Sequence, residues 1–375
     1  MRSVYVHIPF CETKCGYCDF LSFPDRQGLA GAYVEALIGE IEASEHIEGV
    51  GLASVFFGGG TPTVLSAKQL SKILDAIAKK ARLLPETEVT LEANPGGGLD
   101  GAYFARLRES GANRLSIGLQ AVQPTILRRL GRTHTYEDFV QTLEAARGAG
   151  FSNINADLMF ALPGQDIQAF RESLECVLGL GLTHVSVYSL IIEEGTPFYR
   201  LHEQGRLEGL PGEDEDRAMY HELVRTMGYE GYVHYEISNF AKPGNECVHN
   251  IITWTRRDYV GFGIGAHSMV GGCVRWCNTE DVHEYISSPP GGKVHERWDL
   301  SMEEQMQEYA FIGLRMLGGI SLTGFRREFG LEFGQKFAGQ LRRHTDLGLL
   351  ECRGDVLCLT PRGIDLSNRV LADFV

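Results

Sequence analysis

The chain has 375 residues, of which 43% are hydrophobic and 22% charged, and its formal net charge is −14. The length suggests two domains, or one large barrel with an appendage. The composition is typical of a globular protein and excludes disorder along the whole chain. The acidic balance argues against a broad nucleic-acid-binding surface. Because no apolar run is long enough to span a membrane and no apolar signal-peptide segment follows Arg2, we expect a cytoplasmic protein.

From residue 4 to residue 190, short apolar runs alternate with segments of helical periodicity. Six βα units in succession predict a parallel sheet covered by helices and rolled into a partial (β/α)6 TIM-like barrel. A doubly wound open α/β sheet is the alternative. Ser66 is the expected N-cap of the second helix. The predicted strands cover residues 4–8, 54–57, 88–93, 114–118, 153–158 and 184–190, and the helices centre on 33–41, 70–77, 139–146 and 167–177.

Beyond residue 190 this alternation weakens. The acidic residues 213–216 form the first turn of a predicted helix, where the helix dipole favours negative charge. Helical segments from about residue 295 are followed by a predicted hairpin over 349–359. We place a domain boundary in the Pro-Gly run at 289–292, so that residues 1–290 form the barrel with an extension and residues 291–375 a small winged-helix-like domain.

Three cysteines follow the first predicted strand with the spacing Cys11-x3-Cys15-x2-Cys18. A [4Fe–4S] cube normally takes four thiolates, so three cysteines would leave one iron open to a ligand. A zinc site completed by a distant His or Cys, or three unconnected thiols, are the alternatives. Other polar motifs close the second to fifth strands, and the C-terminal ends of parallel strands are where such sheets bind ligands.

This cysteine spacing resembles that of the radical S-adenosylmethionine (SAM) superfamily. The string Tyr-Val-His-Ile-Pro-Phe-Cys at 5–11, the triple glycine at 58–60 and Glu-Ala-Asn-Pro at 92–95 resemble one group within it. That group contains oxygen-independent coproporphyrinogen III oxidases, which are dehydrogenases, and the HemW-type haem chaperones. The resemblance covers most of the chain.

The resemblance implies that Cys11, Cys15 and Cys18 hold a [4Fe–4S] cluster whose open iron is chelated by SAM. Glycines let a ligand approach the backbone, carboxylates accept hydrogen bonds from ribose or ammonium groups, and an arginine can bind a carboxylate with two N–H groups. Taken singly, these residues also fit a tight turn, helix caps and surface positions. The implied SAM-binding residues are Tyr5, Tyr17, Gly59, Gly60, Thr61, Glu92, Gln120, Arg132 and Asp157.

Two features favour the haem chaperones over the dehydrogenases. The dehydrogenases of this group carry a fourth cysteine, in the spacing Cys-x3-Cys-x2-Cys-x-Cys. This sequence has Phe20 at the position of that fourth cysteine. The dehydrogenases also tend to have an N-terminal extension, and this sequence begins three residues before its first predicted strand. The chaperone alternative therefore takes precedence, and whether the chain is an enzyme stays open.

The chaperone group has a His-Asn-x-x-Tyr-Trp motif that is associated with haem binding. Here His249, Asn250 and Trp254 match it, while Thr253 replaces the tyrosine. The resemblance implies that His249 ligates haem iron and that Trp254 stacks on the porphyrin. A packed His–Trp pair is the plainer interpretation. Cys247 is a further candidate ligand, although a buried inert thiol is the preferred interpretation.

The resemblance thus predicts a chaperone that binds a [4Fe–4S] cluster and SAM and carries haem as cargo. It would take haem from a donor and deliver it to membrane and respiratory haemoproteins, as a cytoplasmic protein at the inner face of the membrane. The extension before residue 290 would hold the haem or substrate site. The alternative is a coproporphyrinogen III dehydrogenase that decarboxylates propionates to give protoporphyrinogen IX. No nucleic-acid partner is expected, and a homodimer is left open.

Overall fold

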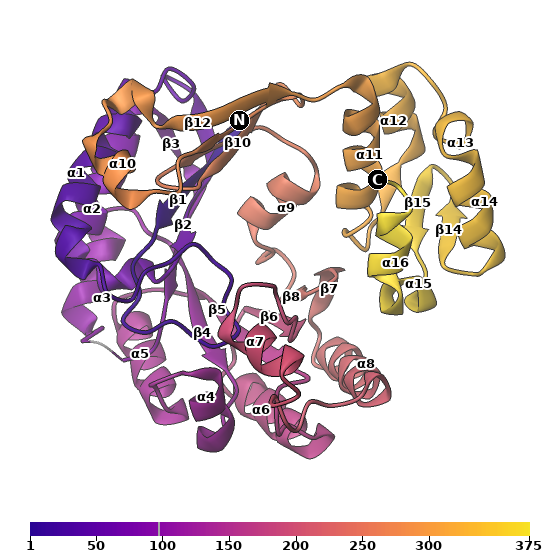
Figure 1. Ribbon diagram of the computed structural model, residues 1–375, viewed down its shortest axis with the longest axis horizontal. Helices are drawn as coiled ribbons and strands as arrows, with labels where there is room; N and C mark the ends of the chain where they lie inside the picture. The colour runs from indigo at the N-terminus through magenta and orange to yellow at the C-terminus, as the bar shows by residue number, and fades with distance from the viewer. Residues whose placement is uncertain (97) are drawn as a thin grey trace.

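The computed structural model describes residues 1–96 and 98–375. Six parallel strands lie side by side in chain order, and helices cover the outside of the curved sheet (Figure 1). A doubly wound sheet would reverse its strand order part-way, so the predicted partial (β/α)6 barrel is confirmed. The strands are β1 (Arg2–Ile8), β2 (Gly51–Gly59), β3 (Arg82–Ala93), β4 (Arg114–Gln120), β5 (Asn153–Phe160) and β6 (His184–Ser189).

The outer helices form where the sequence predicts them, and two more occur. The predicted cap of α2 is confirmed, because the Ser66 hydroxyl accepts a hydrogen bond from the Gln69 N–H and the Gln69 side chain accepts one from the Ser66 N–H. Helices α3 and α4 were not predicted, since each spans nine residues or fewer. The helices are α1 (Ala30–Ala43), α2 (Ala67–Lys80), α3 (Gly101–Glu109), α4 (Pro124–Leu130), α5 (Tyr136–Gly148) and α6 (Ile167–Gly179).

The strands have an apolar outer face and a polar inner face, because successive side chains of a strand point to opposite sides. On β2, Val55 and Phe57 belong to the core shared with the helices, whereas Ser54 hydrogen-bonds inside the barrel. The inner face therefore holds an unusual number of buried polar side chains. They are Ser3, Ser54, Glu88, Thr90, Arg114, Ser116, Asn155, His184 and Ser186.

After β6 the chain extends the sheet at both edges. Strand β8 (Asn239–Ala241) pairs antiparallel with β6, and β9 (Tyr259–Phe262) pairs parallel with β1. Between these two strands, α9 (Val248–Trp254) lies across the open side of the curved sheet (Figure 1). The remaining elements of this extension are α7 (Pro197–Glu203), α8 (Glu213–Tyr229), β7 (Val233–Glu236), β10 (His267–Val270), β11 (Val274–Asn278), α10 (Val282–Ser287) and β12 (Val294–Asp299).

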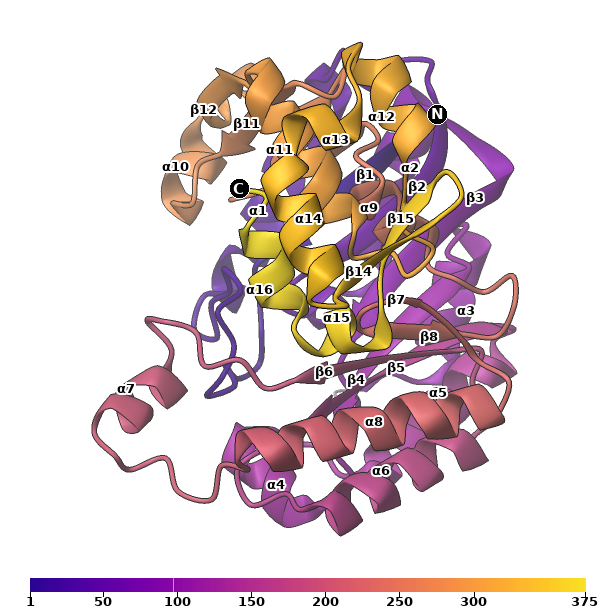
Figure 2. The ribbon, with the colours of Figure 1, turned by 90° about the vertical axis from the view of Figure 1, so that its right-hand side faces the viewer.

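The C-terminal segment has a hydrophobic core of its own, built around Phe325, Phe333, Phe337 and Phe374. The predicted hairpin is confirmed in β14 and β15, which pair antiparallel. In Figure 2 this segment stands in front of the open side of the sheet. Its elements are α11 (Met302–Gly313), β13 (Ile320–Ser321), α12 (Leu322–Phe329), α13 (Phe333–Lys336), α14 (Ala338–Asp346), β14 (Leu350–Arg353), β15 (Val356–Leu359), α15 (Pro361–Asp365) and α16 (Ser367–Ala372).

Two observations bear on how the chain divides. Strand β12 pairs with β11 in the large sheet, and the second core begins with Met306. The boundary at residues 290 and 291 itself stays a prediction. Among the described residues, no helix is both long enough and apolar enough to cross a membrane.

Candidate functional site

A cavity of about 390 Å³ lies at the C-terminal ends of the barrel strands. It brings together residues that the sequence places more than 140 positions apart. Tyr5 is not among the lining residues, because its side chain lies deeper in the barrel, with the hydroxyl 3.0 Å from Nδ1 of His7. The predicted site residues that line the cavity are Cys11, Cys15, Tyr17, Cys18, Gly59, Gly60, Thr61, Glu92, Gln120, Arg132 and Asp157.

The loop that carries the cysteines is fastened to the glycine-rich loop after β2. The Gly60 N–H donates to the Ile8 carbonyl (2.8 Å) and the Thr61 N–H to the Phe10 carbonyl (2.7 Å). The Thr61 hydroxyl donates to Sγ of Cys11 at 3.6 Å. A Cβ at Gly60 would lie 2.6 Å from the Phe10 carbonyl oxygen and 3.0 Å from Sγ of Cys11. Glycine is therefore required there for the two loops to approach each other.

The other end of the cysteine loop is held by α4 and α7. The Gly16 N–H donates to the Leu130 carbonyl (2.9 Å), and the Phe198 N–H donates to the Gly16 carbonyl (2.8 Å). Burial raises the pKa of the Cys18 thiol to about 11, so a bound cation is the kind of partner that would stabilise its thiolate. In residues 1–96 and 98–375, no three His, Cys, Asp or Glu side chains converge on a single-ion site. The three cysteines all line the same cavity.

A chain of hydrogen bonds runs from the cysteine loop to Arg132. The Asn94 amide donates to the Thr61 hydroxyl (2.8 Å), and Arg132 donates to the Asn94 Oδ1 (2.6 Å) and to the Tyr17 hydroxyl (3.1 Å). Within the described part of the chain, Nε of Arg132 and Oε1 of Gln120 are buried without a hydrogen-bond partner. Such atoms are rare unless a ligand or water completes them, so they fit a polar ligand in the cavity.

Gln120 and Gly59 both have left-handed backbone conformations at the cavity wall. The φ angle of Gln120 is +65°, a conformation that non-glycine residues adopt mainly at functional sites and turns. Gly59 has a φ angle of +110°, and a Cβ there would lie 2.6 Å from the His7 ring. Gly59 still pairs with Ile8, whereas the register between β4 and β5 shifts between Gly118 and Gln120, so it is at Gln120 that the backbone departs from regular strand pairing.

Two half-buried carboxylates, Glu92 and Asp157, line the cavity on the inner face of the barrel. Burial raises the pKa of Glu92 to about 8, and the nearby Asp157 charge adds to this rise, while the Gly59 N–H opposes it. Burial also raises the pKa of Asp157, although Asn155 donates to it at 2.7 Å. Neither carboxylate forms an ion pair within 4.0 Å among the residues described. A cationic or hydroxyl-bearing ligand is the partner that this pair lacks.

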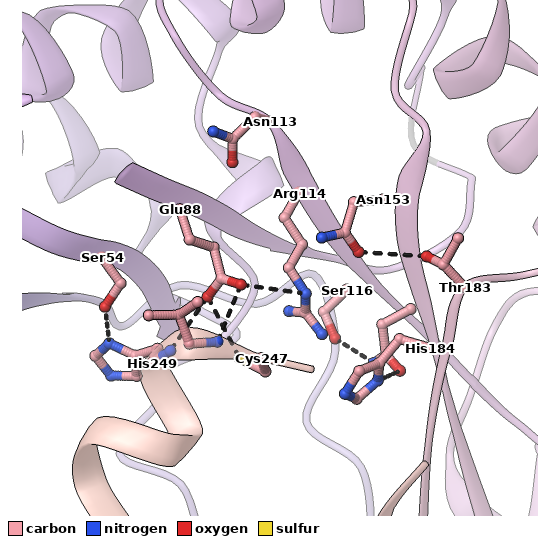
Figure 3. A network of polar contacts seen from close by, with 12 residues as sticks. Ser54, Glu88, Asn113, Arg114, Ser116, Asn153, Thr183, His184, Cys247 and His249 are labelled. Carbon is pink, nitrogen blue, oxygen red and sulfur yellow. Dashed lines mark hydrogen bonds and ion pairs between the residues drawn. The ribbon is translucent and has the colours of Figure 1, made fainter. Parts of the chain in front are cut away.

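Below the cavity, a second buried network holds the start of α9 inside the barrel (Figure 3). The Glu88 carboxylate accepts from the N–H groups of Val248 (3.1 Å) and His249 (3.2 Å), and Sγ of Cys247 lies 3.5 Å away. Nε of Arg114 is 3.9 Å from the same carboxylate, close enough for attraction but too far for a hydrogen bond. Neither Glu88 nor Arg114 is among the site residues predicted from the sequence. Charged residues within predicted buried strands are the signal that could have found them.

The haem-motif residues lie on α9 and outside the cysteine cavity. Nδ1 of His249 is 3.0 Å from the Ser54 hydroxyl, and its ring stacks on Phe56 at 4.9 Å. Burial lowers the pKa of His249 to about 4, so the imidazole is neutral at physiological pH. Trp254, five residues on, lies beneath the Arg315 guanidinium at 4.4 Å. The Thr253 hydroxyl donates to the His249 carbonyl, four residues earlier in the same helix, at 3.1 Å.

Comparison with known proteins agrees with this geometry. The family model described as the radical SAM superfamily matches residues 5–177, and that of the HemN C-terminal domain matches residues 300–366. The chain is 38% identical over its whole length to the "Heme chaperone HemW" of Lactococcus lactis, of which it covers 97%, and 38% identical to that of Bacillus subtilis, of which it covers 99%. The chain belongs to the HemW family of radical SAM proteins. The resemblance stated from the sequence is thereby confirmed.

The solved structure of coproporphyrinogen III oxidase (HemN) from Escherichia coli has the same fold. It superimposes with a TM-score of 0.86 and 24% identity, over 99% of this chain and 89% of that one. A [4Fe–4S] cluster and SAM are the cofactors of the radical SAM superfamily. The cavity suits both groups. It offers three thiols, glycines that let a ligand approach the backbone, two carboxylates without ion pairs in the described residues, and polar atoms without hydrogen-bond partners there.

Proposed function

We propose that this chain is a haem chaperone that binds a [4Fe–4S] cluster and SAM, holds haem and delivers it to membrane and respiratory haemoproteins. The observation that carries the proposal is the 38% identity, over the full length, to curated haem chaperones. The polar inner surface of the barrel and the cysteine cavity support it. A haem donor at the membrane and a homodimeric assembly belong to the same proposal.

Within the cavity, Cys11, Cys15 and Cys18 would hold the cluster. Together the cluster and SAM supply one-electron chemistry when bound. The chain's own side chains would bind and orient SAM. The forked guanidinium of Arg132 suits its carboxylate, and Glu92 and Asp157 suit its ammonium or ribose hydroxyl groups. The remaining implied residues, Gly59, Gly60, Thr61, Gln120 and Tyr17, shape the wall around them. Tyr5 would act from below, through His7.

For the cargo, we assign His249 as the axial ligand of haem iron, with Asn250 and Trp254 on the same helix. Since Nδ1 of His249 faces the Ser54 hydroxyl, Nε2 is the nitrogen that remains to bind iron. The neutral state of the ring favours ligation, because an imidazolium has no free lone pair. One face of Trp254 is covered by Arg315, so the indole contributes by positioning that arginine.

A haem titration tests the chaperone proposal. Protein purified without oxygen, with and without a reconstituted cluster, is titrated with haem while the Soret band is recorded. We expect a shifted Soret band for the wild type and a weaker or displaced one for His249→Ala. His283→Ala, at an exposed position on α10, is the matched control and should behave as the wild type. An unshifted band in the wild type would count decisively against the proposal.

Delivery is tested separately. Haem-loaded protein is mixed with an apo-haemoprotein in membrane vesicles, and transfer is followed by loss of the donor spectrum and gain of the acceptor spectrum. Transfer faster than from free haem supports delivery. Transfer at the rate set by simple haem dissociation would reduce the proposal to haem storage.

A second candidate is oxygen-independent coproporphyrinogen III dehydrogenase. It is favoured by the cavity, because haem storage alone does not need a cavity lined by three cysteines and the implied SAM-binding residues. Phe20 argues against it. This exposed residue lines the cavity at the position where the dehydrogenases carry a fourth cysteine. An anaerobic assay with cluster-replete protein, dithionite, SAM and coproporphyrinogen III decides between them. Protoporphyrinogen formation would establish the enzyme, and its absence would end this candidate.

A further inference from the structure

His184 is a fully buried histidine inside the barrel, on β6, and neither the cluster site nor the SAM site uses it (Figure 3). Both of its ring nitrogens are engaged. Nδ1 lies 2.6 Å from Oδ1 of Asn155, and Nε2 lies 2.9 Å from the Tyr235 hydroxyl. Burial lowers the pKa of His184 well below its usual value, so the ring is neutral. A neutral imidazole donates with one nitrogen and accepts with the other, so it joins its two neighbours in a fixed direction.

On one side, His184 is connected to the cysteine cavity. The Asn155 amide donates to Oδ1 of Asp157 and to the Ser116 hydroxyl, both at 2.7 Å, and these two residues line the cavity. Because an ionised carboxylate can only accept, the Asn155 group that faces it is the NH₂ group. The Asn155 oxygen therefore points to His184 and accepts a hydrogen bond from Nδ1–H.

On the other side, His184 is connected to the start of α9. Since Nδ1 carries the proton, Nε2 accepts from the Tyr235 hydroxyl, and the Tyr235 oxygen accepts from the Cys247 N–H at 3.3 Å. Cys247 is the N-cap residue of α9, and Glu88 binds the next two N–H groups. The first N–H groups of a helix have no partner within the helix. Tyr235 and Glu88 together therefore determine where α9 begins.

These residues form one continuous relay, made up of Asp157, Asn155, His184, Tyr235 and Cys247. Its last four members are at most 7% exposed, whereas Asp157 is half-buried and lines the cavity. Hydrogen bonds in such a shielded chain polarise one another. No described residue of α9 lines the cavity, so a ligand there acts on the helix through the relay.

We infer that His184 is a positioning residue that couples the SAM site to α9, the helix of His249. The inference rests on the proposed haem-chaperone function and adds a form of regulation to it: haem binds more tightly when SAM occupies the cavity. An ammonium or hydroxyl group on Asp157 holds that carboxylate ionised, keeps the relay in one direction and orders the start of α9. His249, two residues after Cys247, is then in place before haem arrives. Ordering by a first ligand lowers the cost of binding the second, and haem must raise the affinity for SAM by the same factor.

Haem titrations with and without SAM measure this coupling. Cluster-replete protein is titrated without oxygen and without a reductant, and the coupling is the ratio of the two haem dissociation constants. Tyr235→Phe removes the hydroxyl that joins His184 to Cys247 and keeps the aromatic ring. Tyr232→Phe is the matched control, because Tyr232 is also 7% exposed and its hydroxyl donates outside the relay, to the Leu182 carbonyl at 2.6 Å.

Two further measurements accompany the titrations. SAM binding without haem is recorded for each variant, and hydrogen exchange of the backbone amides in residues 246–251 is recorded for the wild type with and without SAM. For the wild type, we expect SAM to tighten haem binding about fivefold to tenfold, as is typical of coupled sites, and to slow exchange at the start of α9. Tyr235→Phe should bring the ratio to about one while SAM still binds, and Tyr232→Phe should keep the wild-type ratio. A merely structural role would lower stability in both variants and leave the ratio unchanged.

The failures are distinguishable. If the wild type binds both ligands with a ratio of one, or SAM leaves the exchange of α9 unchanged, the coupling is refuted while the chaperone function stands. If Tyr235→Phe keeps the wild-type ratio, or both tyrosine variants lose it equally, the relay is not the route. The exchange measurement needs no variant, so it keeps the test decisive should Tyr235→Phe not fold. If the wild type binds no haem, the proposed function fails and the coupling falls with it.

Discussion

Replacing Glu88 by glutamine tests how α9 is held in the barrel. Glu88 and Arg114 are 7% and 2% exposed, so both charged groups are shielded from water. A hydrogen bond to a charged group contributes about 1.5–3 kcal/mol, and leaving a buried charge without its partner costs about 3–5 kcal/mol. Glutamine accepts with one oxygen only, so it loses one of the N–H groups of Val248 and His249 and removes the only carboxylate within 4.0 Å of Arg114 among the described residues. We expect Glu88→Gln to lower the free energy of unfolding by about 3–5 kcal/mol.

The measurement is urea denaturation followed by circular dichroism, with Glu35→Gln as the matched control. Glu35 pairs with Lys72 at 3.2 Å, and both side chains are at least half exposed, so its loss should cost under about 1 kcal/mol. A haem titration of Glu88→Gln adds a second readout, because a displaced α9 carries His249 with it. The reasoning is refuted if Glu88→Gln costs no more than the control and binds haem as the wild type does.

Three further predictions concern the cysteine loop, the pH dependence of stability and a helix cap. Gly60→Ala should remove most of the bound iron, measured as iron and sulfide per chain, because the new Cβ would meet the Phe10 carbonyl at 2.6 Å; Gly318→Ala, which meets nothing within 4 Å, should retain it. Burial raises the pKa of Glu40 from 4.5 to about 7 in the folded protein. Between pH 4.5 and about pH 7, Glu40 keeps a proton in the folded state that it has lost in the unfolded state. The free energy of unfolding therefore falls as the pH rises through this range, by about 3 kcal/mol in total. Glu40→Gln should remove this part of the slope in denaturation curves at pH 5 and pH 8, and an unchanged slope would contradict the assignment. Ser66→Ala should cost about 1 kcal/mol of unfolding free energy by breaking the capping box of α2; no measurable loss would show the cap to be redundant.

The local patterns of the sequence determined the barrel and the cluster loop. Six βα units follow from periodicities within ten or so residues, and the cap at Ser66 needs only the four residues from 66 to 69. The cysteine spacing lies within eight residues and requires no knowledge of the fold. Parallel strands present their C-terminal ends at one edge, so the motifs after β1 to β5 were expected to meet there, and the cavity residues do.

The tertiary structure alone decided the rest, because those contacts join residues far apart in the chain. Strands β7 to β12 have three to six residues each, too few for a period-2 pattern to predict them. Nothing near Glu88 in the sequence points to the N–H groups of Val248 and His249. The chain brings them to Glu88 between β8 and β9, and β9 pairs with β1 in the same sheet. The position of Tyr5 deep in the barrel and the stacking of Trp254 under Arg315 are likewise products of packing. Periodicity reports which face of an element is buried, whereas the partner that buries it is chosen by how the whole chain closes.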